Sequence, residues 1–335
     1  MQCLSSILLK TNKQTISKPY FLNMLEKSNN INYTIIIPHK NIPKLLNRCL
    51  KSIPCRDDLE IIIVDDNSSP DIVDFNNFPG QSRQNTKIIF NKNPKGAGYA
   101  RNLALPYVRG KWVIFADADD FFNPIFNDKL DLYKDSAYDF IIFSANSVDS
   151  DTYENVSRVK FLTTAFDKYE EDKKKGEILL KYYCGVPWAK FIKNDLIDKN
   201  NILFDEVPMH NDMHFAYLVS YHSTKFQVDR TAIYCVTDRK SSVSKNISQE
   251  ALLARIYVIG AMNKFYKEHN IPINIDNLHL IQLTKLFFCD KNGYKKGRSI
   301  LKEMGYKASY LNISMFKIIL KSLFRKLLFV KIIKR

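Results

Sequence analysis

Several features that define other classes of protein are missing from this chain of 335 residues. No stretch reaches the roughly 18 uninterrupted apolar residues expected of a membrane-spanning helix. The six cysteines form no CxxC pair and show no metal-ligand spacing, so we expect reduced, mostly buried thiols rather than a disulfide framework or a zinc site. There is no internal repeat and no linker rich in proline and glycine, so we expect the first 240 residues to form one continuous domain.

Acidic residues are absent from both ends of the chain. Residues 1–25 contain none, and their short apolar patch has no basic residue before it, which makes a poor secretory signal. The lack of arginine there also disfavours a transit peptide. We expect residues 1–30 to form a flexible tail, and Met24 is an alternative start of the protein.

The C-terminal segment 311–335 also lacks acids, and it carries seven Lys or Arg of a chain whose formal charge is +15. Large apolar residues fill another face of the helix expected here, and such a helix suits the anionic surface of a membrane. A helix that packs on the core with a basic edge is the alternative. Nucleic-acid binding is disfavoured, because Phe and Ile stand in place of the Asn, Gln and Arg that read bases.

Short apolar runs alternate with helical patterns from residue 33 onward. The alternation predicts a parallel sheet wound by right-handed crossovers. We expect strands at 33–37, 59–64, 87–90 and 112–116, and helices at 42–53 and 98–108.

Beyond residue 120 the alternation loosens, and from residue 247 the chain is helical by pattern. In this part we expect strands at 139–143, 156–162, 189–193, 225–228 and 232–236, and helices at 169–183, 212–221, 251–266, 278–289 and from 311.

Two of the expected strands end in acidic residues. Asp65 and Asp66 close one of them, and Asp117 and Asp119 follow another. The carboxyl ends of parallel strands share one edge of a sheet, where such folds bind ligands. Alternation along an extended segment puts Asp117 and Asp119 on the same side, and Mg²⁺ takes carboxylates together with phosphate oxygens and water. A polar turn is the alternative explanation for either cluster.

A basic segment that contains glycine, residues 93–102, lies between these two clusters. Gly96 and Gly98 begin a dinucleotide fingerprint, but the third glycine is missing and Arg101 stands in its place. As a loop that enters a helix, the segment offers backbone N–H groups, Lys95 and Arg101 to an anion, while an ordinary solvated loop is the alternative. Together with the acids, it predicts a site for a metal ion and a diphosphate.

These motifs, in this order, resemble those of family 2 glycosyltransferases of the GT-A fold, of the type that builds bacterial surface polysaccharides. The resemblance implies an α/β, Rossmann-like GT-A fold with a mostly parallel sheet flanked by helices and a C-terminal helical extension. It covers about 33–244 and is carried by Pro38, Asp65-Asp66, 95–102, Asp117-Ala118-Asp119, 186–191 and 202–206.

In that family a nucleotide lies across the ends of the first strands, and a divalent cation bridges its diphosphate to the DxD motif. The resemblance implies that Asp66 contacts the base, Asp117 the ribose, and Asp119 an Mn²⁺ or Mg²⁺ ion. A basic loop after the last strand would clamp the diphosphate through Arg239 and Lys240. The nucleotide-binding set that the resemblance implies is Pro38, Asp65, Asp66, Lys95, Arg101 and Asp117.

The family's catalytic base usually belongs to a Glu-Asp pair that opens a helix. The matching residues here are Asn211 and Asp212, so the resemblance implies Asp212 as the general base of an inverting displacement. An acid favoured by the dipole at a helix N-terminus is the alternative. His210 and His214 flank Asp212, but Asn211 stands where the HExxH zinc motif has Glu, so a zinc hydrolase is disfavoured.

We therefore expect a metal-assisted inverting enzyme that moves a sugar from a nucleotide-sugar, a UDP-sugar, to a glycan or lipid-linked acceptor at the inner face of the cytoplasmic membrane. A non-catalytic protein of the same fold, which binds a nucleotide-sugar or the membrane, is the alternative because Asn211 replaces the usual Glu. The expected organisation is a GT-A domain at 31–245 with nucleotide and acceptor halves at 31–125 and 126–245, a helical region at 246–310 and a membrane-associating helix at 311–335.

Overall fold

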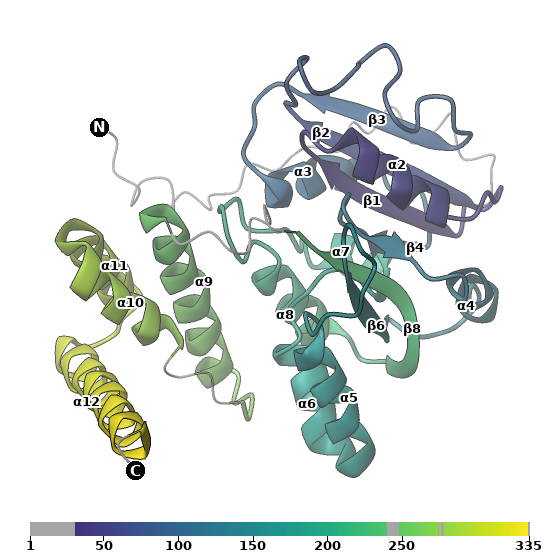
Figure 1. The fold of residues 1–335 in the computed structure, drawn as a ribbon. Coiled ribbons are helices and arrows are strands. Elements are labelled where there is room, and N and C mark those ends of the chain that lie inside the picture. The colour runs from purple at the N-terminus through teal and green to yellow at the C-terminus, as the bar shows by residue number, and fades with distance from the viewer. Residues whose placement is uncertain (1–30, 240–247, 274, 276–277, 334–335) are drawn as a thin grey trace. The chain divides into compact units, whose positions relative to one another are not determined.

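The computed structural model describes residues 31–239, 248–273, 275 and 278–333, and for 321–333 it describes the backbone alone. The predicted tail at 1–30 lies outside these residues. The chain divides after Ser244 into two compact units (Figure 1).

The first unit is built on one sheet with the strand order β3-β2-β1-β4-β7-β6-β8-β5 (Figure 1). Its first four strands pair in parallel, as the alternating pattern predicts. Every residue of β1, β2 and β4 is buried, because helices cover both faces of a parallel sheet, and this explains their continuous apolar runs. These strands are β1 (Tyr33–His39), β2 (Leu59–Asp66), β3 (Thr86–Asn91) and β4 (Trp112–Phe115).

The other half of the sheet is mixed. Strand β7 runs antiparallel to both β4 and β6, while β6 pairs in parallel with β8 and β5 closes the edge antiparallel to β8. Parallel pairings therefore outnumber antiparallel ones over the whole sheet, which confirms the predicted fold class. The four strands are β5 (Phe121–Phe122), β6 (Phe140–Asp149), β7 (Lys190–Lys193) and β8 (Phe226–Asp238).

Helices connect these strands where the sequence predicts crossovers. Pro43 occupies the first turn of α2, where its missing N–H costs no hydrogen bond, and Leu46, Cys49 and Leu50 face the core. The helices of this unit are α2 (Pro43–Ser52), α3 (Ala97–Ala104) with the 3₁₀ turn Leu105–Tyr107, α4 (Phe126–Tyr133), α5 (Lys160–Glu171), α6 (Lys173–Tyr182), α7 (Asn194–Lys199) and α8 (Met213–His222).

The strand predicted at 156–162 is wrong. Residues 160–162 begin α5 instead, and Val159, Leu162 and Phe166 reach the core at helical spacing. The single helix predicted at 169–183 is divided as well. Asp172 takes an extended conformation there, and its side chain accepts a hydrogen bond from the Lys175 N–H to begin α6.

The two short strands predicted at 225–228 and 232–236 are one strand, β8. The polar residues between them suggest a loop, but they form a bulge in β8, because Asp229 pairs with Phe143 and Ala232 with the next residue of β6. Asp229 is held in place there, because its carboxylate accepts hydrogen bonds from Lys129 and Tyr133. The last residues of this continuous strand contact the loop 117–120.

In the part of the chain that the structure describes, the second unit has four helices around a small apolar core. Ser248 caps α9 through the Ala251 N–H, and Asp290 caps α11 through the Gly293 N–H. Within the described residues no helix is both long enough and apolar enough to cross a membrane. The helices are α9 (Gln249–Glu268), α10 (Leu278–Cys289), α11 (Lys291–Glu303) and α12 (Ala308–Ile333).

Helix α12 begins at Ala308, three residues before the membrane helix predicted from the sequence. Its residues Leu311 and Met315 are buried in the core of the second unit. On the other side of the helix, Ile313, Phe316 and Leu320 are exposed by 57%, 61% and 37%. One side of this helix therefore packs on a core, as the alternative explanation has it, and the other side presents apolar surface.

None of the five cysteines within the described residues forms a disulfide. Cys49, Cys184 and Cys235 are buried, while Cys55 and Cys289 are exposed. The expectation of reduced thiols agrees with this part of the structure.

Candidate functional site

The acids at the end of β2 hold two loops in place. The Asp65 carboxylate accepts hydrogen bonds from His39 Nδ1 at 2.8 Å and from the Ser68 N–H at 2.9 Å. The other ring nitrogen of His39 accepts from the Ile42 N–H, which fixes the neutral tautomer. Asp65 is thus buried and anchors its own turn.

Asp66, which the resemblance assigns to contact with the nucleotide base, is also buried. Its carboxylate accepts hydrogen bonds from Asn91 Nδ2 at 2.8 Å, from the Gly96 N–H at 2.9 Å and from the Lys95 N–H at 3.4 Å. Gly96 adopts a φ of 92°, which favours glycine, and it directly precedes α3. Asp66 therefore ties the end of β2 to the start of α3.

Helix α3 packs closely against the segment 204–212. The side chain of Asn102 exchanges two hydrogen bonds, each of 2.9 Å, with the backbone of Phe204. Gly98 lies so close to this segment that an added Cβ would stand 2.1 Å from the Asp205 carbonyl oxygen. Lys95 pairs with Glu206 at 3.1 Å. The basic segment 93–102 is thus a docking element for the chain that leads to Asp212.

Arg101 joins the DxD motif to the start of α8. Its guanidinium donates to Asp117 Oδ1 at 2.6 Å and to Asn211 Oδ1 at 3.0 Å, and it lies 5.2 Å from the centre of the Phe204 ring. The Arg101 side chain is only 5% exposed. Arg101 was predicted to face an anion, and the anion that it meets in this structure is the carboxylate of Asp117.

The loop that carries the DxD motif, residues 117–120, is held by the end of β8. The Asp117 N–H donates to the Tyr234 hydroxyl at 2.8 Å, and the Thr237 N–H donates to Asp120 Oδ1 at 2.7 Å. The Asp119 carbonyl accepts from both Arg48 and the Thr237 hydroxyl. The position of this loop is therefore set by residues from α2 and β8.

The two carboxylates of the motif differ in their partners. Asp119 Oδ2 accepts from Arg239 Nε at 2.8 Å and lies 2.7 Å from Arg239 Nη2. Burial and the neighbouring Asp117 raise the pKa of Asp119, although Arg239 opposes the shift. Lys240, the other predicted diphosphate contact, lies outside the described residues.

Asp212 occupies the N-cap position of α8. Its side chain makes no capping hydrogen bond to the amides of its own helix. Burial raises the pKa of Asp212 to about 6, against the opposing influence of Arg101. The charges of Arg101 and Asp117 both act on the Asp212 carboxylate, and the neighbouring Asn211 bonds to Arg101.

His214 is a neighbour of Asp212 that holds a separate contact, with its Nδ1 3.2 Å from Asp205 Oδ1. The part of the chain that the structure describes contains no group of three or more His, Cys, Asp or Glu side chains placed to hold a metal ion. A cation at the DxD motif would thus take only part of its ligands from these side chains.

Residues 34–197 match the family described as glycosyl transferase family 2. This stretch contains the acids that end β2, helix α3 and the DxD motif. The chain carries a family 2 glycosyltransferase domain.

Known proteins that resemble this glycosyltransferase include two curated relatives. "Uncharacterized glycosyltransferase YibD" of Escherichia coli (strain K12) is 23% identical over 257 residues, which cover 75% of this chain and 70% of that protein. "Poly(ribitol-phosphate) beta-glucosyltransferase" of Bacillus spizizenii is 33% identical over 93 residues, which cover 26% of this chain and only 15% of that protein.

Solved structures share the fold of the glycosyltransferase. S. aureus TarS 1-349 in complex with UDP-GlcNAc aligns with a TM-score of 0.54 over 81% of this chain and 91% of that one, at 17% sequence identity. At this identity the likeness bears on the fold alone. With the sheet order and the family match, it confirms the predicted GT-A fold.

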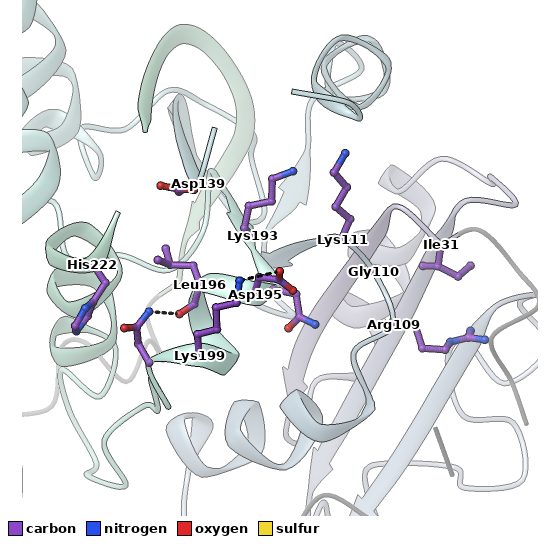
Figure 2. A pocket seen from close by; sticks show the side chains of 12 residues that line it. Ile31, Arg109, Gly110, Lys111, Asp139, Lys193, Asp195, Leu196, Lys199 and His222 are labelled. Atoms are coloured by element: carbon purple, nitrogen blue, oxygen red, sulfur yellow. Dashed lines mark hydrogen bonds and ion pairs between the residues drawn. The ribbon is translucent and has the colours of Figure 1, made fainter. Parts of the chain in front are cut away.

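A cavity of about 690 Å³ in the glycosyltransferase lies where β1 and β4 begin, at the ends of the strands opposite to the acidic residues (Figure 2). Its cations already have partners. Arg109 Nε pairs with Glu60 at 2.6 Å, Lys111 Nζ donates to a carbonyl oxygen at 2.9 Å, and Lys193 Nζ to another at 3.1 Å. None of the predicted site residues lines this cavity, so the acids at the strand ends remain the candidate site of the glycosyltransferase.

Sequence reasoning missed several residues that shape this site. Arg48, Tyr234 and Thr237 fix the DxD loop, yet each lies far from it in the chain and none belongs to a recognisable pattern. Lys190 is buried as well, where its ammonium donates to the Cys184 carbonyl at 2.9 Å. The one available signal for Lys190 was its place in the stretch 186–191 that resembles the family.

Proposed function

We propose that this glycosyltransferase transfers a sugar from a UDP-sugar to a hydroxyl of a glycan or lipid-linked acceptor, with inversion at the anomeric carbon and Asp212 as the general base. The observation that carries the proposal is the setting of this carboxylate. It opens α8 beside the Arg101–Asp117 pair and makes no cap hydrogen bond to its own helix. In this proposal its oxygens accept the proton of an acceptor hydroxyl.

The raised pKa of Asp212 suits a general base. Such a base is most effective when its pKa lies near the working pH. With a pKa of about 6, Asp212 is ionised at neutral pH and holds a proton more strongly than an exposed aspartate does. As the acceptor oxygen attacks the anomeric carbon and the bond to the diphosphate oxygen breaks, Asp212 takes the hydroxyl proton and the nucleoside diphosphate departs from the opposite face.

The DxD loop fits a hard divalent cation, Mn²⁺ or Mg²⁺. Asp119 offers carboxylate oxygens, its pKa is raised by burial and by Asp117, and it already attracts the positive charge of Arg239. In the proposal Asp119 holds the ion, and donor phosphates and water supply the other ligands. When bound, the ion supplies Lewis-acid stabilisation of the departing diphosphate.

The nucleotide lies, in this proposal, across the ends of β1, β2 and β4. Pro38, Asp66, Lys95 and Asp117 surround that edge of the sheet. The choice of a UDP-sugar is supported by the fold shared with TarS, whose structure contains UDP-GlcNAc.

The acceptor is proposed to belong to a surface polysaccharide, which the Bacillus spizizenii relative supports, since its name describes glucosyl transfer to poly(ribitol-phosphate). We further place the protein at the inner face of the cell membrane. The exposed apolar residues Ile313, Phe316 and Leu320, with Lys317 beside them, support this placement.

The test is the substitution Asp212→Asn, assayed with a panel of UDP-sugars, Mn²⁺ and a surface-glycan acceptor. We expect transfer to fall by about 10²- to 10⁴-fold, the usual contribution of a general base, while the affinity for UDP stays the same. Asp195→Asn is the matched control, because Asp195 is also an acid at the start of a helix, α7, but lies outside the site.

Unchanged transfer by Asp212→Asn would remove Asp212 from the mechanism. If the unaltered protein binds UDP and Mn²⁺ but transfers or hydrolyses no sugar across the panel, the proposed activity itself is wrong. Equal losses in Asp212→Asn and Asp195→Asn would point to a folding effect rather than to lost base catalysis.

A further inference from the structure

Both carboxylates of the DxD motif already carry a guanidinium partner. Arg101 holds Asp117 at 2.6 Å, and two nitrogens of Arg239 lie 2.8 and 2.7 Å from the same Oδ2 atom of Asp119. Asp119 is also the residue proposed to hold the divalent cation. A positive group therefore stands where the ion is needed.

The two arginines differ in how deeply their side chains are buried. Arg101 is fixed by Asp117, by Asn211 and by the Phe204 ring, and its side chain is 5% exposed. The Arg239 side chain is 21% exposed and comes from the end of β8. Of the two arginines, Arg239 is therefore the one that can leave its carboxylate with the smaller structural change.

The DxD loop does not need Arg239 to keep its position. The Asp119 carbonyl is bonded to Arg48 and to the Thr237 hydroxyl, and the Thr237 N–H holds Asp120. Release of the Asp119 carboxylate by Arg239 would thus leave the backbone of the loop fixed and expose an oxygen ligand.

We propose that Arg239 and the divalent cation compete for Asp119, and that the donor diphosphate resolves the competition in favour of the ion. A guanidinium binds phosphate oxygens as well as carboxylates, so the diphosphate offers Arg239 a new anionic partner. The metal ion and the nucleotide then bind cooperatively, and each is weak without the other. This inference rests on the proposed metal-assisted function.

The test measures Mn²⁺ binding from the electron paramagnetic resonance signal of free Mn²⁺, with and without UDP, for the unaltered protein and for Arg239→Gln. For the unaltered protein we expect UDP to strengthen Mn²⁺ binding by about tenfold or more. In Arg239→Gln we expect Mn²⁺ without UDP to bind about tenfold more tightly, so the gain on adding UDP shrinks. Arg239→Lys keeps the positive charge but loses the contact through two nitrogens, so its Mn²⁺ affinity should lie between those of the unaltered protein and Arg239→Gln.

Arg158→Gln is the matched control, because Arg158 pairs with Asp238, one residue before Arg239, at 3.1 Å. We expect it to leave Mn²⁺ affinity unchanged, and thermal melting of each variant checks that it is folded. Equal Mn²⁺ affinities of the unaltered protein and Arg239→Gln without UDP would overturn the inference while leaving the proposed function intact. Sugar transfer that persists in a chelator, with no Mn²⁺ bound even beside UDP, would overturn both the inference and the proposed role of the ion.

Discussion

At the scale of single residues, the site is a set of charges that already neutralise one another. Asp117 and Asp119 meet arginines, and Asp66 meets backbone amides. Asp212 differs in that its side chain makes no capping hydrogen bond at the start of its helix, and burial raises its pKa to about 6. The proposed general base is therefore a carboxylate whose charge is disfavoured by its environment.

This difference predicts the pH dependence of the reaction. A carboxylate with a raised pKa gains its proton as the pH falls through about 6, and a protonated Asp212 cannot accept the acceptor proton. We expect kcat/KM to be level at neutral pH and to fall about tenfold per pH unit below pH 6. The measurement is kcat/KM between pH 5 and 8 at constant ionic strength, with a thermal melt at each pH to exclude unfolding.

His214 is the control for that profile, because its imidazole lies two residues from Asp212 in the sequence. His214→Asn should leave the acidic limb where it is, since its ring contacts Asp205 rather than the site carboxylates. Loss of the limb in His214→Asn would assign it to the histidine and argue against Asp212.

At the scale of elements, helix α3 depends on one small residue to approach the segment 204–212. A Cβ on Gly98 would stand 2.1 Å from the Asp205 carbonyl oxygen, which is a backbone atom and cannot turn away. Gly98→Ala must therefore move α3 or this segment, and Arg101 on the same helix joins Asp117 to Asn211. This contact therefore links the edge of the sheet where the donor is proposed to bind with Asp212, the proposed general base.

We expect Gly98→Ala to cost about 1–3 kcal/mol of stability, as overpacking in a dense interior does, and to weaken UDP binding several-fold. Gly110→Ala is the matched control, because its Cβ would stand 2.6 Å from the Thr34 N atom at the opposite edge of the sheet. It should lower the melting temperature without changing UDP affinity. Calorimetric titration of both variants with UDP decides the matter, and unchanged affinity in Gly98→Ala would show that the close approach serves packing alone.

The elements also show how far the sequence predicts the site. The acids at strand ends, helix α3 and the helix that Asp212 opens follow from local patterns of apolar and polar residues. The partners of those acids do not, because Arg48 and Tyr234 reach the DxD loop only once the sheet has formed. The sequence predicts two short strands in place of β8 for a related reason, since the extra residues of the bulge in β8 interrupt its apolar pattern.

At the scale of the whole molecule, the chain combines a catalytic domain with a helical unit. The last helix of that unit, α12, has apolar residues on its buried side and on its exposed side. Leu311 and Met315 belong to the core of that unit, so removing 311–335 would also damage its packing. A deletion therefore cannot separate membrane binding from folding. Ile313, Phe316 and Leu320 are exposed, and their replacement leaves the core side of α12 untouched.

We expect the triple change of Ile313, Phe316 and Leu320 to Ser to lower binding to vesicles of anionic phospholipid by about tenfold or more, because partial burial of three large side chains is lost. Binding of the unaltered protein should also weaken as salt is raised, because Lys317 and its basic neighbours are attracted to the headgroups. The matched control changes Ile72, Ile125 and Leu132 to Ser, which are exposed residues of the catalytic domain. Cosedimentation with anionic and zwitterionic vesicles measures both sets, and equal binding of the two triple variants would argue against α12 as the membrane contact.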